Sequence, residues 1–177
     1  MTQTVLVTGA TGLAGANICR LLTERGDHAR TRLRICRRCA LAALGVEVVT
    51  GDVTDAGAVV RAARGADSAI HCAALLGGAS QDLADFERVN IGGTKNVLDA
   101  AGVVDLGRVV AVSTGTSFDT AGGLDREDAP VSKAPSSDPY TVTKVAAFLD
   151  VMSRAEKGRD IVSTHPGRHL RPLAGGE

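Results

Sequence analysis

Short apolar runs alternate along this chain with longer segments in which apolar residues recur every three or four positions. The first run, Thr4–Val7, is apolar and β-branched, which is typical of a buried strand. A helical pattern follows, formed by Ala14, Ile18, Leu21 and Leu22, and it ends near Gly26. Further strands are expected at 46–49, 67–72, 108–112 and 160–164, and a long helix at 82–101. The alternation predicts an α/β fold with a doubly wound parallel sheet and helices on both faces.

The segment 29–34 occupies the place of the second strand but is unusually basic. It reads ARTRLR, with three arginines where a buried parallel strand is nearly all apolar. Only its position between Gly26 and a short helical segment closed by Gly45 favours a strand.

Three glycines lie between the first strand and the first helix, in the sequence TGATGLAG. Gly9, Gly12 and Gly15 are residues that allow a tight turn, backbone approach to a pyrophosphate and close packing of helix on strand. The helix N-terminus that follows offers free N–H groups and a partial positive charge to phosphates. Strand, turn and helix together predict a nucleotide-binding loop.

Polar and small residues also follow the other strands. Asp52, after the third strand, can accept a hydrogen bond from an adenine amino group, while Thr54 or Asp55 is better suited to cap the next helix. Ser113 and Thr114 follow the fifth strand, where hydroxyls point into the crevice in which doubly wound sheets bind ligands.

Two polar residues on buried elements have both a structural and a functional interpretation. His71 ends the fourth strand, and a lone histidine in this position is more often structural than catalytic. Asn90 lies inside the long helix, where a buried amide needs partners. It either bridges to a neighbouring loop or joins the water network of the site.

Tyr140 is the only tyrosine of the chain, and it follows a long polar loop at 119–138. Lys144 comes four residues later, so both side chains lie on one face of a helix. The ammonium is expected to favour the phenolate and to lower the pKa of the phenol. The pair predicts a proton-transfer site.

Composition excludes several classes of protein. The 177 residues fit one domain, and 20 basic residues balance 20 acidic ones, so neither a nucleic-acid surface nor a membrane surface is indicated. No apolar run approaches the roughly 20 residues that span a bilayer. No signal peptide precedes the first strand, and we expect a cytoplasmic protein.

The cysteines do not indicate a metal site. Cys36 and Cys39 form a CxxC pair, but zinc needs two further ligands, and Cys19 and Cys72 are single residues on other elements. Reduced thiols without a role are the favoured interpretation, and no metal is expected.

As a set, these motifs resemble the extended short-chain dehydrogenase/reductase superfamily, in its NAD(P)-dependent epimerase/dehydratase branch. The resemblance runs from about Thr4 to Gly167. The matching segments are the glycine turn TGATGLAG, the adenine-side GDVTD, HCAAL after strand four, the helix VNIGGTKNVL, VVAVSTGTSF with its hydroxyls, and the YxxxK signature YTVTK.

The resemblance implies a Rossmann-like domain at 1–167, a small-molecule substrate and hydride transfer at a hydroxyl/carbonyl pair. Tyr140 would be the general acid/base, and Lys144 would hold the nicotinamide ribose and tune Tyr140. Thr114 would hydrogen-bond the reacting oxygen, with Ser113 as the second choice. The residues expected to contact NAD or NADP are Gly9, Thr11, Gly12, Leu13, Gly15, Arg34, Asp52, Val53, Ala73, Ala74, Asn90, Ser113, Tyr140 and Lys144.

The end of the second strand bears on the choice between NAD and NADP. In dinucleotide folds an acidic residue there binds the ribose hydroxyls of NAD, whereas an arginine accommodates the extra phosphate of NADP. This chain has Arg34, with Arg37 and Arg38 beyond it and no carboxylate. NADP is therefore favoured, and a solvated basic loop is the alternative interpretation.

Three features depart from the family pattern. The second strand is basic, and His165 stands where relatives usually have arginine before Pro-Gly. The chain also stops where relatives continue into a substrate-binding domain, which is expected to be missing, and 168–177 is expected to be a disordered tail. A reductase is favoured over a nucleotide-sugar epimerase. The alternatives are a non-catalytic dinucleotide-binding module and an inactive gene remnant.

The missing domain would also affect association. Strand 160–164 would be an unprotected sheet edge, and the helix face around Phe148, Leu149 and Met152 would lose its cover. Self-association into homo-oligomers or aggregates is the expected result.

Overall fold

A computed structural model describes residues 2–33, 41–76, 82–118, 131 and 137–166 of the chain. Arg34, the CxxC pair Cys36 and Cys39, and the tail 168–177 lie outside the described residues. So does most of the loop 119–138.

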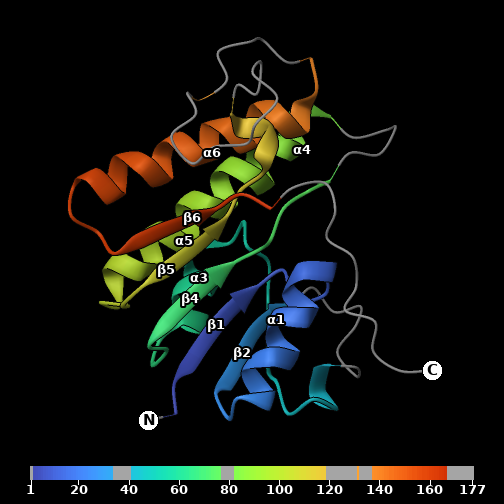
Figure 1. The fold of residues 1–177 in the computed structure, drawn as a ribbon, viewed down its shortest axis with the longest axis vertical. Helices are drawn as coiled ribbons and strands as arrows, with labels where there is room; N and C mark the ends of the chain where they lie inside the picture. Colours follow the sequence, from blue (N-terminus) through green and yellow to red (C-terminus); the bar gives the residue numbers. More distant parts are fainter. Residues whose placement is uncertain (1, 34–40, 77–81, 119–130, 132–136, 167–177) are drawn as a thin grey trace.

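Six parallel strands form one sheet in the order β3-β2-β1-β4-β5-β6, which confirms the predicted doubly wound fold (Figure 1). The strands are β1 (Thr4–Thr8), β2 (His28–Leu33), β3 (Glu47–Thr50), β4 (Ser68–His71), β5 (Val109–Val112) and β6 (Ile161–Thr164). The order reverses between β1 and β4, and ligands of such sheets bind beyond the carboxyl ends of the strands at this point.

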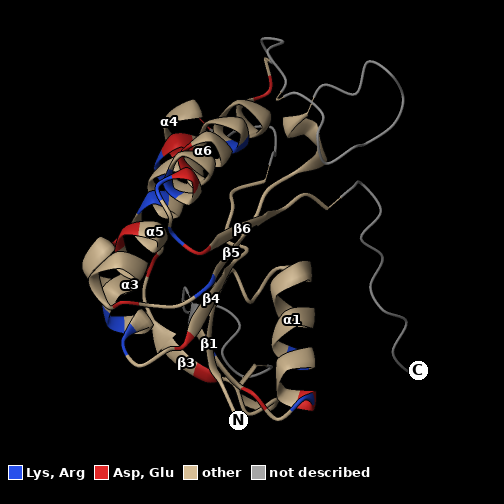
Figure 2. Cartoon of the chain, turned by 60° about the vertical axis from the view of Figure 1, so that its left-hand side comes forward, with Lys and Arg blue, Asp and Glu red and all other residues tan. Residues whose placement is uncertain are grey.

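Helices cover both faces of the sheet. They are α1 (Leu13–Glu24), α3 (Ala56–Ala63), α4 (Leu83–Phe86), α5 (Gly93–Val103) and α6 (Pro139–Glu156), with a π-helical turn η2 (Glu87–Gly92) and a 3-10 turn η3 (Gly115–Ser117). Figure 2 shows α1 on one face and α3, α4, α5 and α6 on the other. It also shows acidic and basic residues intermixed along the outer helices.

Two apolar clusters fill the space between the layers. Because side chains alternate along a strand, β1 sends Leu6 to one face and Val5 and Val7 to the other. Leu6 packs with residues of α3, α5 and α6, whereas Val5 and Val7 pack with α1. Leu21 of α1 departs from the helical pattern predicted for it, because 43% of its side chain is exposed.

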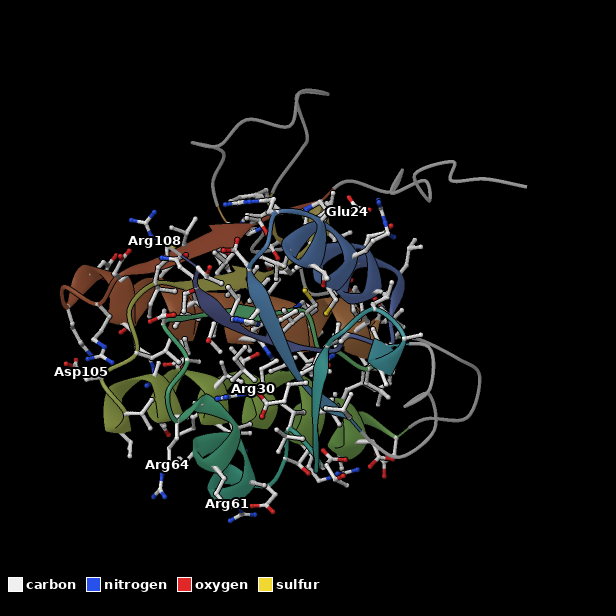
Figure 3. All side chains as sticks on the ribbon, turned by 90° about the horizontal axis from the view of Figure 1, so that it is seen from below. Glu24, Arg30, Arg61, Arg64, Asp105 and Arg108 are labelled. Atoms are coloured by element: carbon white, nitrogen blue, oxygen red, sulfur yellow. The ribbon has the colours of Figure 1, made fainter. Side chains whose placement is uncertain are left out.

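The basic second strand is confirmed, and its polar residues have partners. Thr31 is fully buried and its hydroxyl donates to the Val7 carbonyl at 2.8 Å. Arg30 pairs with Glu47 at 2.7 Å and donates to the carbonyl of Arg64 at 2.7 Å (Figure 3). Arg30 therefore ties β2 to β3 and to the end of α3, which is how the strand accommodates this charge.

The long helix predicted at 82–101 is wrong in one detail, since it is interrupted by η2. Asp82 caps its start, as its carboxylate accepts from the N–H of Ala84 at 3.1 Å. The helix then widens into the π-helical turn and resumes as α5. Such turns are rare and occur often at functional sites. Asn90 lies within the turn and is buried.

Local capping fixes where two other helices begin. Asp55 is the N-cap of α3 and accepts from the N–H of Ala58 at 2.9 Å, so Asp55 fills the role that the sequence left open between Thr54 and Asp55. Asp138 caps α6 through the N–H groups of Tyr140 and Thr141, at 3.3 and 3.0 Å. Among the described residues, no helix is long and apolar enough to cross a membrane.

Candidate active site

A cavity of about 500 Å³ opens at the carboxyl ends of β1, β4 and β5, where the strand order reverses. We call it the switch-point cavity. It brings together these predicted site residues: Gly9, Thr11, Gly12, Leu13, Gly15, Asp52, Val53, Ala73, Ala74, Ser113, Tyr140 and Lys144. Thr114 and Asn90 do not line it, and Arg34 is outside the described residues. The assignment of each residue to a cofactor stays a prediction.

Glycine is required at two positions of the turn between β1 and α1. Gly9 has φ +74°, and a Cβ there would lie 2.6 Å from the backbone nitrogen of Ala73, just beyond β4. A Cβ on Gly15 would clash with the carbonyl oxygen of Gly9. The turn therefore packs directly on the end of β4 and the first turn of α1, so its backbone forms the floor of the cavity.

The N-terminus of α1 faces this cavity without a side-chain cap. Gly12 is the N-cap residue and carries no side chain, and the first turn of α1 contains no acidic residue. The first N–H groups of a helix have no partner within the helix. Together with the partial positive charge of the helix end, they suit an anionic group such as a phosphate.

Asp52 and Val53, which follow β3, also line the cavity. One carboxylate oxygen of Asp52 accepts from the N–H and the hydroxyl of Thr54, both at 3.0 Å. Asn96 of α5 donates to the carbonyl of Val53 at 2.9 Å. These contacts fix the backbone and the carboxylate against α5, which suits a wall that contacts a flat base.

Asn90 bridges the loop after β4 to α6. Its Oδ1 accepts from the N–H of Leu75 at 2.7 Å, and its Nδ2 donates to the Leu75 carbonyl at 3.3 Å and to the hydroxyl of Thr143 at 3.0 Å. Of the two interpretations of this buried amide, the structure has the bridge to a neighbouring loop. Asn90 thus positions the cavity wall without lining it.

Leu75 and Leu76 line the cavity next to the predicted Ala73 and Ala74. They were not among the site residues predicted from the sequence. The available signal was the apolar pair that follows directly after the two alanines. Leu76 is 67% exposed, so an apolar side chain stands at the mouth of the cavity.

His71 is a structural histidine, as the sequence favoured. It is buried, with Nδ1 2.7 Å from the hydroxyl of Thr8 and Nε2 3.0 Å from that of Thr94. Burial, together with the charge of Lys144, lowers the pKa of His71 to about 3. The ring is therefore neutral and connects β1 and β4 to α5.

Tyr140 and Lys144 both line the cavity from the first two turns of α6. Hydrogen bonding by the Thr114 side chain acts to lower the pKa of Tyr140, against the larger raising effect of burial. The Nζ of Lys144 donates to the carbonyl of Val112 at 2.7 Å, and the side chain is buried. Burial lowers the pKa of Lys144 to about 8.

The expected lowering of the Tyr140 pKa by Lys144 is wrong. Burial raises the pKa of Tyr140 from its ordinary value, hydrogen bonding by Thr114 acts in the opposite direction, and the charge of Asp138 raises it again. The helical spacing placed the two residues on one face, but the ammonium of Lys144 is bound to the Val112 carbonyl. At neutral pH the phenol therefore keeps its proton.

Thr114 and Ser113 are oriented differently after β5. The Thr114 hydroxyl lies 3.2 Å from that of Thr116, whereas the Ser113 hydroxyl lies 3.3 Å from that of Ser117. Thr114 is the hydroxyl that influences the pKa of the phenol, and Ser113 lines the cavity. A protonated phenol can donate its proton to a substrate oxygen, and the phenolate that results can take a proton back.

Comparison with known proteins gives matches over nearly the whole chain. Residues 5–174 match the model of the NAD dependent epimerase/dehydratase family. Sterol demethylase protein B of Methylococcus capsulatus is 33% identical, with 96% of this chain and 52% of the relative covered. A 3 beta-hydroxysteroid dehydrogenase/Delta 5→4-isomerase of Mycobacterium tuberculosis is 37% identical, with coverage of 85% and 42%.

A solved structure gives a similar match. A short-chain dehydrogenase/reductase superfamily protein from Agrobacterium tumefaciens, crystallised with bound NAD, is 27% identical with a TM-score of 0.74. The alignment covers 92% of this chain and 48% of that one. The chain spans about half the length of the curated relatives it matches.

Proposed function

The chain belongs to the NAD dependent epimerase/dehydratase family, and from this we propose that it binds NAD(P) in the switch-point cavity and interconverts a hydroxyl and a carbonyl group of a small molecule. The observation that carries the proposal is that Tyr140 and Lys144 line the same cavity as the glycine turn. A cavity that only binds a nucleotide needs no proton-transfer groups. A phenol, a hydroxyl and a buried ammonium at one site therefore favour catalysis.

The described residues fit a dinucleotide. A Cβ on Gly9 or Gly15 would clash with neighbouring backbone, so the turn keeps a bare backbone that a cofactor can approach. The uncapped end of α1 suits a pyrophosphate. Asp52 and Val53 would contact the adenine, Ala73 and Ala74 the inner side of the cofactor, and Lys144 the nicotinamide ribose. When bound, the nicotinamide would supply or accept the hydride.

Tyr140 would move the proton. Its raised pKa keeps the phenol protonated at neutral pH, so it can donate a proton to a carbonyl oxygen. Thr114 would hydrogen-bond the same oxygen and fix its position. A protonated phenol favours the direction from ketone to alcohol, and we therefore propose a reductase.

A nucleotide-sugar epimerase is the second candidate within the family. An epimerase returns the hydride to the same substrate and consumes no cofactor. Assays with NADPH and a panel of apolar ketones, and with NAD⁺ and nucleotide sugars, separate the two. Net oxidation of NADPH with a ketone supports the reductase, and conversion of a sugar without net cofactor turnover supports the epimerase.

Substitution of Tyr140 by phenylalanine tests the proton donor. Tyr140→Phe keeps the ring and removes the hydroxyl, so turnover should fall by roughly 10²–10⁴-fold while cofactor affinity stays nearly unchanged. The neighbouring exposed position provides a control, because Val142→Ala should leave both quantities unchanged. A Tyr140→Phe protein as active as the parent would contradict the assigned role.

We also propose a preference for NADP, on the sequence of 33–38 alone. Arg34 would pair with the 2′-phosphate, and charge-assisted contacts of this kind contribute about 1.5–3 kcal/mol. Calorimetric titration with NADPH and NADH measures the difference, and Arg34→Ala should remove it. Equal affinities in the parent would refute the preference.

A further inference from the structure

His165 follows β6 and contacts the segments that carry both members of the Tyr140–Thr114 pair. Its Nδ1 lies 3.2 Å from the carbonyl oxygen of Thr114, and its Nε2 lies 3.1 Å from the hydroxyl of Ser163. Its ring packs edge-on against Phe118 and Phe148, with centroid distances of 4.5 and 4.6 Å. The two phenyl rings also contact each other, at 5.6 Å.

The contacts define the proton positions on the ring. A carbonyl oxygen can only accept, so Nδ1 carries the hydrogen that is donated to Thr114. The other nitrogen then accepts from the hydroxyl of Ser163. Burial lowers the pKa of His165 and the charge of Lys144 lowers it further, while the bond to Thr114 acts in the opposite direction. The neutral ring satisfies both contacts.

The Thr114 carbonyl is held by two donors. The N–H of Ser117 donates to it at 3.1 Å within the 3-10 turn, and His165 donates from β6. Together they occupy both lone pairs of this oxygen and restrict rotation of the peptide that bears Thr114. Phe148 lies on α6, two turns after Tyr140, so the same histidine also packs on the helix that carries the phenol.

We propose that His165 is a positioning residue for the site, holding the Thr114 hydroxyl in register with Tyr140. The hydrogen bond to the Thr114 carbonyl holds the segment that bears Thr114. Packing of the ring between Phe118 and Phe148 holds the helix that bears Tyr140. The proposal rests on the proposed function for its effect on turnover, but its geometric part can be measured without any reaction. His165 itself is not a catalytic residue, because its two nitrogens face Thr114 and Ser163.

Two variants separate the hydrogen bond from the ring. His165→Phe keeps an aromatic ring between Phe118 and Phe148 but cannot donate to Thr114. His165→Asn restores a donor at the position of Nδ1 without the ring. Ser163→Ala is the matched control, since it removes the contact at Nε2 and leaves the Thr114 carbonyl alone.

The readout is the ionisation of Tyr140, followed by phenolate absorbance after a rapid pH jump. Tyr140 is the only tyrosine and the chain has no tryptophan, so the signal belongs to this residue alone. Burial raises the pKa of Tyr140 and hydrogen bonding by Thr114 lowers it, so loss of the Thr114 side chain is expected to raise the pKa further. The rise expected is roughly half to one pH unit, the size of one hydrogen bond.

The expected results are as follows for proteins whose circular dichroism matches the parent. Thr114→Ala and His165→Phe both raise the Tyr140 pKa, His165→Asn raises it less, and Ser163→Ala leaves it unchanged. Where a carbonyl substrate is turned over, His165→Phe lowers kcat about tenfold or more while cofactor affinity is unaffected. If Thr114→Ala shifts the titration and His165→Phe does not, the proposal is overturned. An inactive parent would refute the proposed function and leave the titration result standing.

Discussion

At the residue scale, the position of Lys144 in the site could be predicted from the sequence, but the direction of its pKa shift could not. The four-residue spacing placed Lys144 and Tyr140 together on one helix face, and both line the cavity. The directions of their pKa values could not be predicted. Both directions are set first by burial, which depends on how the whole chain folds around the two side chains.

The lowered pKa of Lys144 predicts how cofactor affinity changes with pH. The ammonium is present below a pKa of about 8 and is lost as pH rises through it, well below the ordinary value of 10.5. NADPH affinity should therefore be constant near neutral pH and fall by up to about tenfold per pH unit above 8. Calorimetric titration across this range measures the effect.

Lys144→Met is the control for this pH series. It has similar length and no charge, so its affinity should be weaker and should not depend on pH across the same range. If the parent and Lys144→Met show the same pH dependence, another group is responsible and Lys144 does not contact the cofactor.

At the scale of elements, the periodic pattern predicted five of the six strands and the long helix at 82–101, whereas β2 was expected from its position alone. It did not predict η2, because a π-helical turn leaves the apolar face intact: Phe86, Val89 and Val97 are all buried. The turn accompanies the contacts of Asn90 with Leu75 and Thr143, which come from other parts of the chain. Such tertiary contacts leave no local pattern in the sequence.

Gly15 gives a prediction at the same scale. A methyl group there clashes with the Gly9 carbonyl, so Gly15→Ala must push α1 away from β1. We expect a loss of about 1–3 kcal/mol in the free energy of unfolding, with weaker NAD(P) binding. Thermal unfolding and calorimetric titration measure the two effects.

Gly57 is a matched control, since it lies in α3 and a Cβ there would meet only side-chain atoms at 3.4 and 3.5 Å. Gly57→Ala should be neutral or stabilise the protein by up to about 1 kcal/mol. If Gly15→Ala and Gly57→Ala have the same unfolding free energy and the same NAD(P) affinity, the turn tolerates a side chain at position 15.

At the scale of the whole molecule, the two faces of the sheet are unequally covered. Figure 2 shows α1 on one face, beside β1, while the other described helices lie opposite. On the side of α1, Val162 of β6 is 41% exposed, and an open hollow of about 380 Å³ lies between Ile18 and Thr164. Within the described residues β6 pairs only with β5.

Of the three residues on the α6 face that the sequence predicted to be uncovered, two are exposed within the described structure. Leu149 and Met152 are exposed, at 51% and 39%, but Phe148 is 6% exposed because Phe118 and His165 pack on it. The helical pattern could not reveal these partners, which lie 30 and 17 positions away.

These surfaces predict that the 177-residue chain self-associates through β6. An outer strand with exposed apolar residues offers free N–H and C=O groups to a second strand. Val162→Lys should reduce the associated fraction measured by light scattering, because an edge lysine opposes pairing. Val103→Lys, at an exposed position on α5, should have no such effect. A parent that is monomeric at all concentrations would refute the prediction.

The bare N-terminus of α1 has a consequence for dynamics. Because Gly12 supplies no side chain and no acidic residue follows in the first turn, nothing in this turn substitutes for an anion. The amide protons of Leu13 and Ala14 should then exchange rapidly with solvent in the free protein, and a bound pyrophosphate should slow their exchange by closing the end of the helix. Binding and local folding of this turn are thus coupled. Part of the binding free energy offsets the cost of ordering the first turn of the helix.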